Sequence, residues 1–259
     1  MTLSFRQWTW RRRQPLMLLA ARVGVAAVLL ALLEAGVRSG LVNGYLVAPP
    51  SLVLRRLIEL LATSAFRGLI GATLLETAVA SCAAAVAGML LGYALWRRPL
   101  LRRAYEPVLV ALFSSPLILL YPIFLVLFGR GLVAVITLSA LYGVVPVALF
   151  TLEGLAGVRP ALLRVGVSLR LSRADLFRHI QLPAAAPTIF TGIRLGLAYV
   201  LISVVATEFV AQIGGLGNFV AETSLRFQTS ATYAGIAMVL VTAVGFIALT
   251  RGLERRLAR

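Results

Sequence analysis

Residues 131–152 read GLVAVITLSALYGVVPVALFTL, a run without a single charged side chain. A helix needs about 20 consecutive apolar residues to cross the hydrocarbon layer, and it satisfies its backbone polar groups within the segment. This stretch therefore predicts a transmembrane helix. Five similar stretches lie on either side of it along the chain, at about 15–37, 69–95, 107–128, 190–211 and 233–250. We expect an all-α integral membrane protein with six spans in a single domain, residues 1–259.

The composition supports this fold class. Of the 259 residues, 60% are hydrophobic and only 13% are charged, a balance that does not suit a water-soluble core with a polar coat. The net charge of +16 includes 25 basic residues, all of them arginine. Arginines between apolar runs orient a chain in a bilayer, so we expect the lipid bilayer, and no nucleic acid, as their partner.

The rare residue types exclude several chemistries. Without lysine the chain lacks the amine that a phosphate-binding loop or a Schiff base needs, so it cannot itself be a P-loop ATPase. A single cysteine, Cys82, and a single histidine, His179, form neither an intrachain disulfide nor a histidine-rich metal site. We expect no catalytic residue and no metal site, with Cys82 as a small core residue and His179 in solvent.

The arginines also predict the orientation of the spans. With the N-terminus in the cytoplasm, the cytoplasmic side holds 17 arginines and the opposite side holds six. This imbalance predicts that both termini are cytoplasmic. Arg22 interrupts the apolar part of the first stretch and no small-x-small cleavage site follows Leu33, so we interpret residues 15–37 as an uncleaved span. The cytoplasmic arginines form groups at 6–13, 97–103, 159–178 and 251–259.

The loop at residues 39–68 lies on the extracytoplasmic side. Its Pro49-Pro50-Ser51 stops any preceding helix, and Ser51 can cap a new one. Leu54, Leu57 and Leu61 follow at helical spacing with charged residues between them. The pattern predicts a helix on the membrane surface.

The long cytoplasmic loop, residues 153–189, predicts two short helices joined by a turn. Leu162, Val165 and Leu169 recur at i, i+3 and i+7, which gives the first helix an apolar face. A helix, a turn and a helix would therefore face the cytosol. The alternative is a solvated loop that only follows the positive-inside rule.

The second of these helices is expected to begin at Ser172. Asp175 follows three residues later, where a carboxylate favours the positive helix end. Pro183 and Pro187 are expected to prevent this helix from continuing into the fifth span.

The sequence beyond this point resembles a known family. Residues 176–187 read LFRHIQLPAAAP and are followed by Gly192-Ile193-Arg194 and Ala206-Thr207-Glu208. This combination resembles the cytoplasmic signature of permease subunits of binding-protein-dependent ABC importers. In that family the segment before Leu-Pro forms a coupling helix, which docks in a cleft of the ATPase subunit.

Three further pieces resemble the nitrate/sulfonate/taurine branch of the family. The resemblance covers about residues 45–256 and implies a type I ABC importer-like fold in the bacterial inner (plasma) membrane. It also implies transport of a small polar solute, such as nitrate, a sulfonate, a taurine-like anion or a vitamin precursor. The pieces are Pro49-Pro50-Ser51, the stretch from Glu106-Pro107 through Ser114-Ser115-Pro116 and Pro122 to Phe128-Gly129, and Gly215-Leu216-Gly217.

The resemblance implies partners as well. A pair of cytoplasmic ABC ATPase subunits would bind ATP and Mg, which leaves this chain a non-catalytic subunit with no cofactor of its own. A second permease copy, identical or different, would complete the pathway, and an extracytoplasmic binding protein would deliver the solute. Coupling to the ATPase is expected to involve Leu162, Arg164, Val165, Gly166, Ser168, Leu169, Arg170, Ser172, Asp175 and Phe177.

The chain departs from the family pattern within this loop. Counted back from Leu182-Pro183, the family's Glu-Ala-Ala falls on Arg164-Val165-Gly166, and its glycine falls on Arg170. Arg164 reverses a charge, and Arg170 places a large side chain where the chain turns tightly. We expect the contact with the ATPase to differ from that of the family.

Glu76 and Glu208 are the acids placed most deeply in apolar stretches. A carboxylate in a bilayer is costly unless it is paired or hydrated, so both are candidates for the solute pathway. Both also lie near the ends of their spans, which leaves a purely structural role open.

Prolines interrupt the third span and suggest a second set of pathway residues. Helix breaks at membrane depth are tolerated where freed carbonyls face a wet cavity, so Pro116 could mark the pathway, with Ser114, Ser115 and Tyr121 as hydrogen-bonding groups. The alternative is a kink in a packed helix. Gly88 and Gly92 form a G-x-x-x-G pattern that permits close helix contact.

Two other classes of membrane protein compete with this interpretation. An intramembrane serine protease needs a base at membrane depth, but the only histidine lies in the cytoplasmic loop, so we reject it. A self-contained secondary transporter or channel would show inverted repeats or several buried charges, and neither is visible.

Overall fold

The computed structural model describes the backbone of residues 4–257 and the side chains of residues 21–250 and 252. The arginine groups at 6–13 and beyond residue 252 lie outside the described side chains. Within the described part the chain is all helical. Its elements are α1 (Ser4–Arg38), α2 (Pro50–Ala62), α3 (Ser64–Arg97), α4 (Pro99–Ser114), the 3-10 helix η1 (Leu117–Leu120), α5 (Tyr121–Phe128), α6 (Leu132–Ala156), α7 (Pro160–Ser168), α8 (Arg173–Leu176), the π-helix η2 (Phe177–Gln181), α9 (Leu182–Ala211), α10 (Gly215–Leu225) and α11 (Thr229–Leu257).

Four described helical segments are long and apolar enough to cross a membrane: α3, α6, the run from α8 to α9, and α11. The bent pair of α4 and α5 adds a fifth if it is one span. The first predicted span, residues 15–37, lies within α1, whose side chains before residue 21 are outside the described part.

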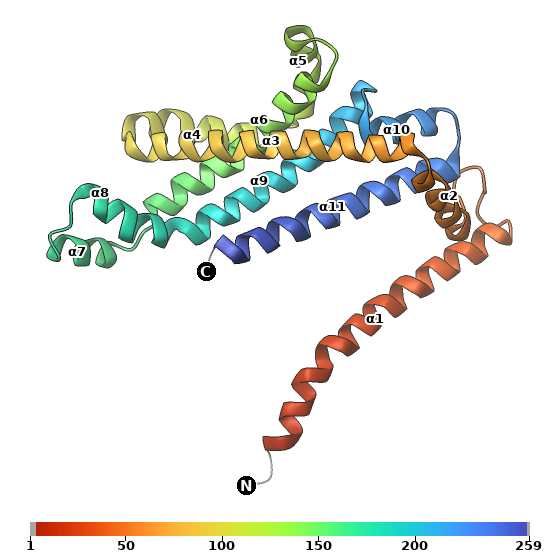
Figure 1. Cartoon of the computed structure of the whole chain (residues 1–259), viewed down its shortest axis with the longest axis horizontal. Coiled ribbons are helices and arrows are strands. Elements are labelled where there is room, and N and C mark those ends of the chain that lie inside the picture. Colours follow the sequence, from red (N-terminus) through yellow and green to blue (C-terminus); the bar gives the residue numbers. More distant parts are fainter. Residues whose placement is uncertain (1–3, 258–259) are drawn as a thin grey trace.

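The centre of the bundle consists of α3, α6 and α9, with α11 alongside (Figure 1). Gly88 and Gly92 let α3 approach α6: a Cβ on Gly88 would lie 2.6 Å from Val147 Cβ, and one on Gly92 would lie 2.5 Å from the Ala148 carbonyl oxygen. The predicted close contact at this G-x-x-x-G pattern is confirmed.

The stretch predicted as a span at 107–128 is not one straight helix. Its first part belongs to α4, which begins at Pro99 and ends at Ser114, and the chain resumes as η1 and α5 after a break. The two parts differ in direction by 96°. Pro116 lies in the break and has no amide hydrogen to continue the helix. As a result α5 projects from the bundle (Figure 1).

The expectation that Pro183 and Pro187 would separate the cytoplasmic helix from the fifth span is wrong. Helical structure continues without a break from Arg173 to Ala211. The turn before Pro183 widens into η2, where the Leu182 amide donates to the Phe177 carbonyl, and Pro183 lies in the first turn of α9. The wider π-turn leaves room for a residue without an amide hydrogen, so the helix passes Pro183 without ending.

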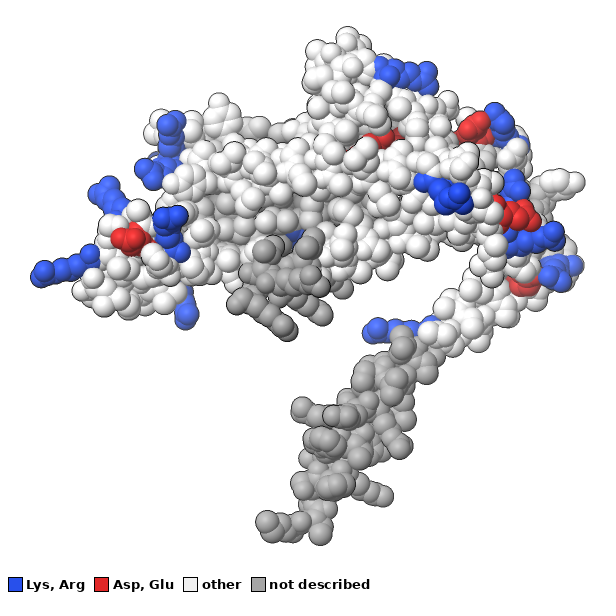
Figure 2. Space-filling model, viewed as in Figure 1, with Lys and Arg blue, Asp and Glu red and all other residues white. Residues whose placement is uncertain are grey.

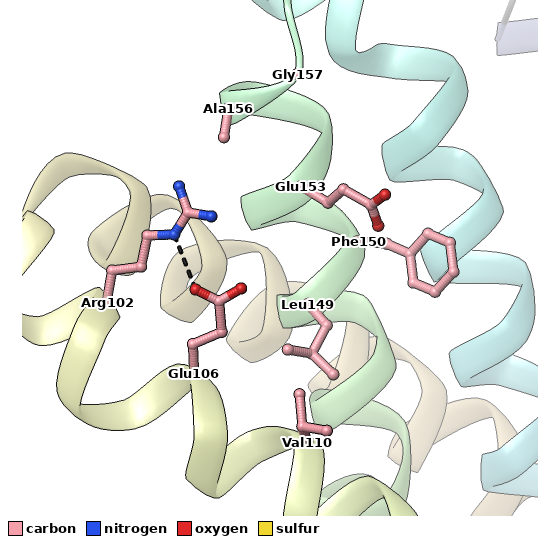
Figure 3. A pocket seen from close by; sticks show the side chains of 8 residues that line it. All are labelled: Arg102, Glu106, Val110, Leu149, Phe150, Glu153, Ala156 and Gly157. Atoms are coloured by element: carbon pink, nitrogen blue, oxygen red, sulfur yellow. Dashed lines mark hydrogen bonds and ion pairs between the residues drawn. The ribbon is translucent and has the colours of Figure 1, made fainter.

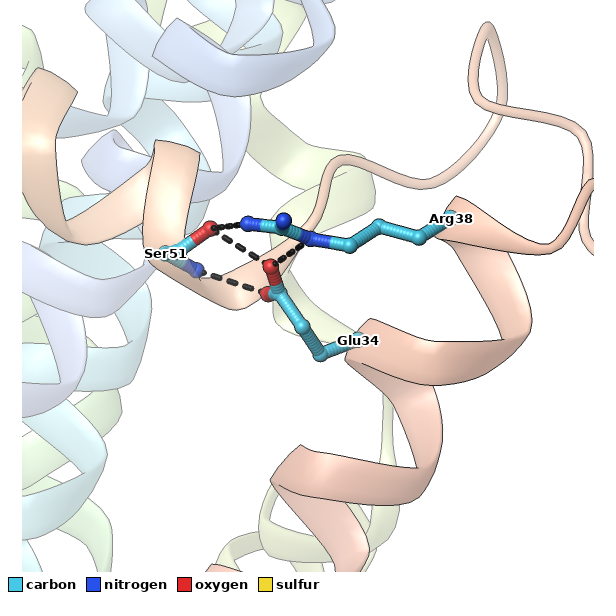
Figure 4. A network of polar contacts seen from close by, with 3 residues as sticks. All are labelled: Glu34, Arg38 and Ser51. Atoms are coloured by element: carbon cyan, nitrogen blue, oxygen red, sulfur yellow. Dashed lines mark hydrogen bonds and ion pairs between the residues drawn. The ribbon is translucent and has the colours of Figure 1, made fainter.

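α1 diverges from the bundle in Figure 1 and is joined to α2 by a polar contact near its end. Glu34 accepts hydrogen bonds from Arg38 Nε (2.6 Å), from the Ser51 amide (3.0 Å) and from Ser51 Oγ (2.7 Å) (Figure 4). The expected cap by Ser51 is wrong: Pro49 precedes α2, and Ser51 binds Glu34 instead. A carboxylate from α1 thus satisfies a free amide at the start of α2.

The amphipathic character predicted for the segment after Pro50 is confirmed in α2. Leu54 lies on its apolar face and is exposed, as expected for a helix on a membrane surface. On the opposite face Arg56 and Arg55 each donate a 3.1 Å hydrogen bond to Glu59, which holds the pKa of that carboxyl below its usual value.

Charged side chains gather toward two ends of the bundle, and the surface between them is mostly uncharged (Figure 2). One end carries α7, α8 and the junction of α3 with α4, as the positive-inside pattern predicts for segments on one side of a membrane. Cys82 lies on the exposed surface of α3, so its expected place in the core is wrong.

Candidate functional site

The unit formed by α7 and α8 is anchored to the end of α3. Phe177 packs edge-on against Tyr93, with ring centroids 5.5 Å apart, and lies 5.9 Å from the Trp96 ring. Leu163 of α7 packs into the same cluster. Gly166 brings α7 against α8, because a Cβ there would lie only 2.3 Å from Leu176 Cδ1. The unit is therefore a packed part of the fold rather than a solvated loop.

An apolar face of this unit remains uncovered. Val165 is 55% exposed, Val167 66% and Leu169 67%, whereas Leu162 is half-buried. We call Val165 and Leu169, which lie one helical turn apart at the end of α7, the exposed α7 face. Neighbouring apolar side chains that are exposed beyond the spans and flanked by arginines are typical of a surface that binds another protein.

Arg170 adopts the backbone conformation for which the family uses glycine. Its φ is +53°, in the left-handed region. The Leu171 amide donates to the Gly166 carbonyl (3.1 Å) and the Arg170 amide donates to the Val167 carbonyl (2.9 Å). These two bonds form a Schellman motif, the tight turn that ends α7. The tight turn expected at this position is confirmed.

The predicted start of the second helix is confirmed too. Ser172 precedes α8, and its Oγ accepts a 3.1 Å hydrogen bond from the Asp175 amide. Of the other residues predicted for ATPase coupling, Arg164 and Ser168 are exposed beside the α7 face. Phe177, in contrast, points into its own chain and anchors the unit.

Glu76 and Glu208, although far apart in sequence, meet inside the bundle. Glu208 is 0% exposed and Glu76 1% exposed. Glu208 accepts 2.7 Å hydrogen bonds from Thr73 Oγ1 and from the Gly217 amide. The carboxylate thereby joins α9 to α3 and to the first turn of α10, so neither acid lines an open passage in this conformation.

Gly215 and Gly217 make room for the Glu208 carboxylate. Gly215 has φ +66°, and a Cβ on it would overlap the Glu208 carboxyl group. A Cβ on Gly217 would lie 2.2 Å from the Val205 carbonyl oxygen. The Gly215-Leu216-Gly217 pattern thus serves the close approach of α10 to α9.

The remaining pathway candidates lie at the break between α4 and α5. Ser114 and Ser115 are exposed, but their hydroxyls donate to the Val110 and Ala111 carbonyls of their own helix. Tyr121 is buried in a cluster with Leu138. The same cluster includes Ala211, one helical turn after Glu208, so Tyr121 connects the break to the end of α9 that carries the buried acid.

A pocket of about 540 Å³, lined by both apolar and charged side chains, opens between α4 and α6. Arg102 Nε donates to Glu106 Oε2 at 2.8 Å (Figure 3), and Glu153 of α6 also lines the pocket. The lining therefore contains charges of both signs. Glu153 carried no signal in the sequence, because it follows an apolar span without a recognisable motif.

Comparison with known proteins identifies the family. Residues 84–259 match the family described as binding-protein-dependent transport system inner membrane component. The chain belongs to this family. It is therefore the membrane permease of a binding-protein-dependent importer, which decides against a self-contained secondary transporter or channel.

Relatives support the branch suggested by the sequence. The permease is 29% identical over 256 residues to the taurine transport system permease protein of Escherichia coli (strain K12), covering 97% of this chain and 92% of that protein. It is 26% identical over 233 residues to a putative aliphatic sulfonates transport permease protein of Bacillus subtilis (strain 168), covering 90% and 84%. A nitrate import permease protein of Leptolyngbya laminosa is 29% identical over 185 residues, covering 69% and 66%.

Solved structures agree in fold. An inward-facing methionine ABC transporter superposes with a TM-score of 0.64 at 19% identity, covering 74% of this permease and 95% of that chain. An amino acid ABC transporter superposes with a TM-score of 0.60 at 18% identity, covering 73% and 92%. Both support the expected fold of a type I importer permease.

Sequence reasoning missed the partners of the buried acids. Thr73, Thr77 and Ser81 recur every four residues along α3, as do Ser203 and Thr207 on α9. These polar stripes inside apolar spans are visible in the sequence. Their meeting depends on how α3 packs on α9, which the periodicity of each helix does not specify.

Proposed function

We propose that the exposed α7 face docks in a cleft of a cytoplasmic ATPase subunit and transmits its movement to the spans. The observation behind this proposal is a contrast in the α7 segment: Leu163 and Gly166 face the chain itself, whereas Val165 and Leu169 are more than half exposed. An ATPase pair would bind ATP and Mg and hydrolyse ATP. This permease then contributes no catalytic residue.

We further propose that two permease copies, identical or different, form the pathway and that an extracytoplasmic binding protein delivers the solute. Both termini would be cytoplasmic, in line with the arginine distribution. The solute would be a small polar anion such as nitrate, a sulfonate or taurine, or else a vitamin precursor. Similarity to the taurine, sulfonate and nitrate permeases favours the anions.

The docking proposal is tested with Val165→Asp and Leu169→Asp. Removing one apolar anchor costs about 2 kcal/mol or more at an interface, and burying an unpaired carboxylate adds a desolvation cost. We expect the ATPase to be lost when a tagged permease is purified from membranes, while the amount of inserted permease stays unchanged. Leu41→Asp is the matched control, because Leu41 is also exposed but lies after α1 on the opposite side. Normal copurification in both α7 variants would contradict the proposal.

The substitution Arg164→Glu distinguishes two possible forms of the contact between the α7 segment and the ATPase. If the ATPase cleft is acidic, Arg164→Glu introduces like-charge repulsion and lowers the amount of copurified ATPase, most clearly at low salt. If the arginine is only tolerated, the same change restores the family pattern and leaves transport equal or higher. Copurification at two salt concentrations distinguishes the two cases.

The solute is tested in proteoliposomes that contain the permease, its ATPase and its binding protein. Uptake of radiolabelled taurine, nitrate and an alkanesulfonate is compared, each with and without ATP. We expect uptake of one of these anions, dependent on both ATP and the binding protein. Uptake of a vitamin precursor instead would leave the docking proposal intact and replace only the solute.

A further inference from the structure

Glu76 is a buried acid to which no described residue donates a hydrogen bond. It is 1% exposed, and neither carboxyl oxygen has a hydrogen-bonding partner among the described residues. It lies one helical turn after Thr73, whose Oγ1 donates to Glu208, so the Glu208 carboxyl group is its polar neighbour across the interface of α3 and α9. Two ionised carboxylates would face each other as acceptors without a donor between them, at a high cost in an apolar interior.

The two acids are not equivalent, because only Glu208 receives donors. Thr73 Oγ1 accepts the Leu216 amide hydrogen (2.9 Å), so its own proton points to Glu208 Oε1 (2.7 Å). The Gly217 amide donates to Glu208 Oε2 (2.7 Å) from the positive end of α10. These donors stabilise a negative charge on Glu208 rather than on Glu76.

From this asymmetry we propose that Glu76 and Glu208 form a buried proton-binding site, in which Glu76 holds a proton and shares it with an ionised Glu208. The pair then carries one negative charge, balanced by the amide donors of α10. The shared proton also links α3 to α9 at the corner where α10 begins.

No cation near the pair takes the place of this proton. In the described part of the chain, Arg130 reaches the end of α9 from the loop after α5, and its guanidinium donates to the Ala211 and Gln212 carbonyls. Other charged or titratable side chains on the packed elements are bound elsewhere: Arg67 donates to the Leu61 and Ala62 carbonyls, Arg226 pairs with Glu222, and Tyr233 donates to the Leu46 carbonyl. Arg194 and Glu153 lie toward the opposite end of the bundle from the two acids. Tyr121, on α5, carries a neutral phenol.

The hydroxyls around the pair add polarity but no positive charge. Gly143 of α6 contacts both Ala84 of α3 and Val200 of α9, so the three helices are in register at this point. The hydroxyl-bearing residues lie one or two helical turns from this point, in the direction of the two acids. These hydroxyls are buried and have no partner within the described structure; they belong to Thr77, Ser81, Ser139, Ser203 and Thr207. They leave a second carboxylate uncompensated, and the positive end of α10 opposes a bound metal cation. The remaining ligand that fits is a proton.

The test is infrared spectroscopy of the purified full-length permease in lipid nanodiscs at neutral pH. A protonated carboxylic acid has a C=O stretching band that is separate from the carboxylate bands. We expect such a band in the native protein, and its loss in Glu76→Gln. Glu153→Gln is the matched control and should leave the band unchanged. Absence of the band in the native protein would overturn the proposal whether or not any variant folds.

Thermal stability provides a second, independent readout. In Glu76→Gln the amide can still donate to Glu208, so Tm should stay within about 2 °C of the native value. Glu208→Gln leaves one of the two donors without an acceptor, and Tm should fall by about 4 °C or more. The reverse order would overturn the assignment. Exchange of sodium for choline should not change Tm; a sodium-dependent rise that Glu76→Gln abolishes would instead identify a cation site.

Discussion

Arg170 has a strained, left-handed backbone conformation, with a φ of +53°. Non-glycine residues in the left-handed region cost about 1–2 kcal/mol, and the turn after α7 requires that region because both Schellman hydrogen bonds depend on it. The exposed arginine side chain has no described contact in the bundle that would offset this cost.

Arg170→Gly should therefore stabilise the permease. We expect a gain of about 1 kcal/mol, which corresponds to a rise in Tm of roughly 2–4 °C in detergent. Arg170→Ala is the matched control: it also removes the charge but keeps a Cβ in the left-handed region, so Tm should not rise. An equal rise in Tm in both variants would show that the arginine side chain, rather than the left-handed backbone conformation, destabilises the permease.

Between elements, the contact of α3 with α6 depends on small residues rather than on large apolar side chains. A Cβ on Gly88 would meet both the Val147 side chain and the Val144 carbonyl oxygen at less than 3 Å. Gly88→Ala should therefore push the two helices apart and cost about 1–3 kcal/mol. Gly71→Ala is the control in the same helix, since nothing lies within 4 Å of its Cβ and alanine favours helix. Thermal unfolding in detergent should separate the two variants; equal stability would argue against close packing at Gly88.

Elements with a strong local signal were predictable. The length of the apolar stretch located α6, and the Ser172 cap located α8, because each depends on neighbours in sequence. The predictions that proved wrong concern residues whose contacts with distant parts of the chain, or whose helix geometry, differ from what the neighbouring sequence indicates. Ser51 binds Glu34 instead of capping its own helix, and a π-turn carries the chain past Pro183.

The buried acid pair shows the same limit. Each glutamate could be identified from its place in an apolar stretch, as could the glycines after Glu208. Their contact joins residues separated by more than a hundred positions, and only the packing of α3 on α9 creates it. The exposed α7 face lies between these cases: its spacing was predictable, but the inward anchor at Phe177 was not.

For the whole molecule, the two charged ends predict its orientation in the membrane. Reporter fusions after Arg103 and Arg178 should report the cytoplasm, and fusions near Arg56, Arg130 and Arg226 should report the outside. Fusions after Arg13 and at Arg259 test the two termini, which lie outside the described side chains. The control is a fusion on the opposite side of each span. A middle loop that reports the wrong side would contradict the six-span topology.

The uninterrupted helix from Arg173 to Ala211 has a mechanical consequence. Its 39 residues would extend roughly 58 Å at 1.5 Å per residue, so one continuous helix reaches from α8 to Glu208. Gly192 and Gly196 let this helix pack closely on α6 near its middle. We expect a displacement of α8 to be carried along the helix to its far end, where α10 is attached, without a hinge between them.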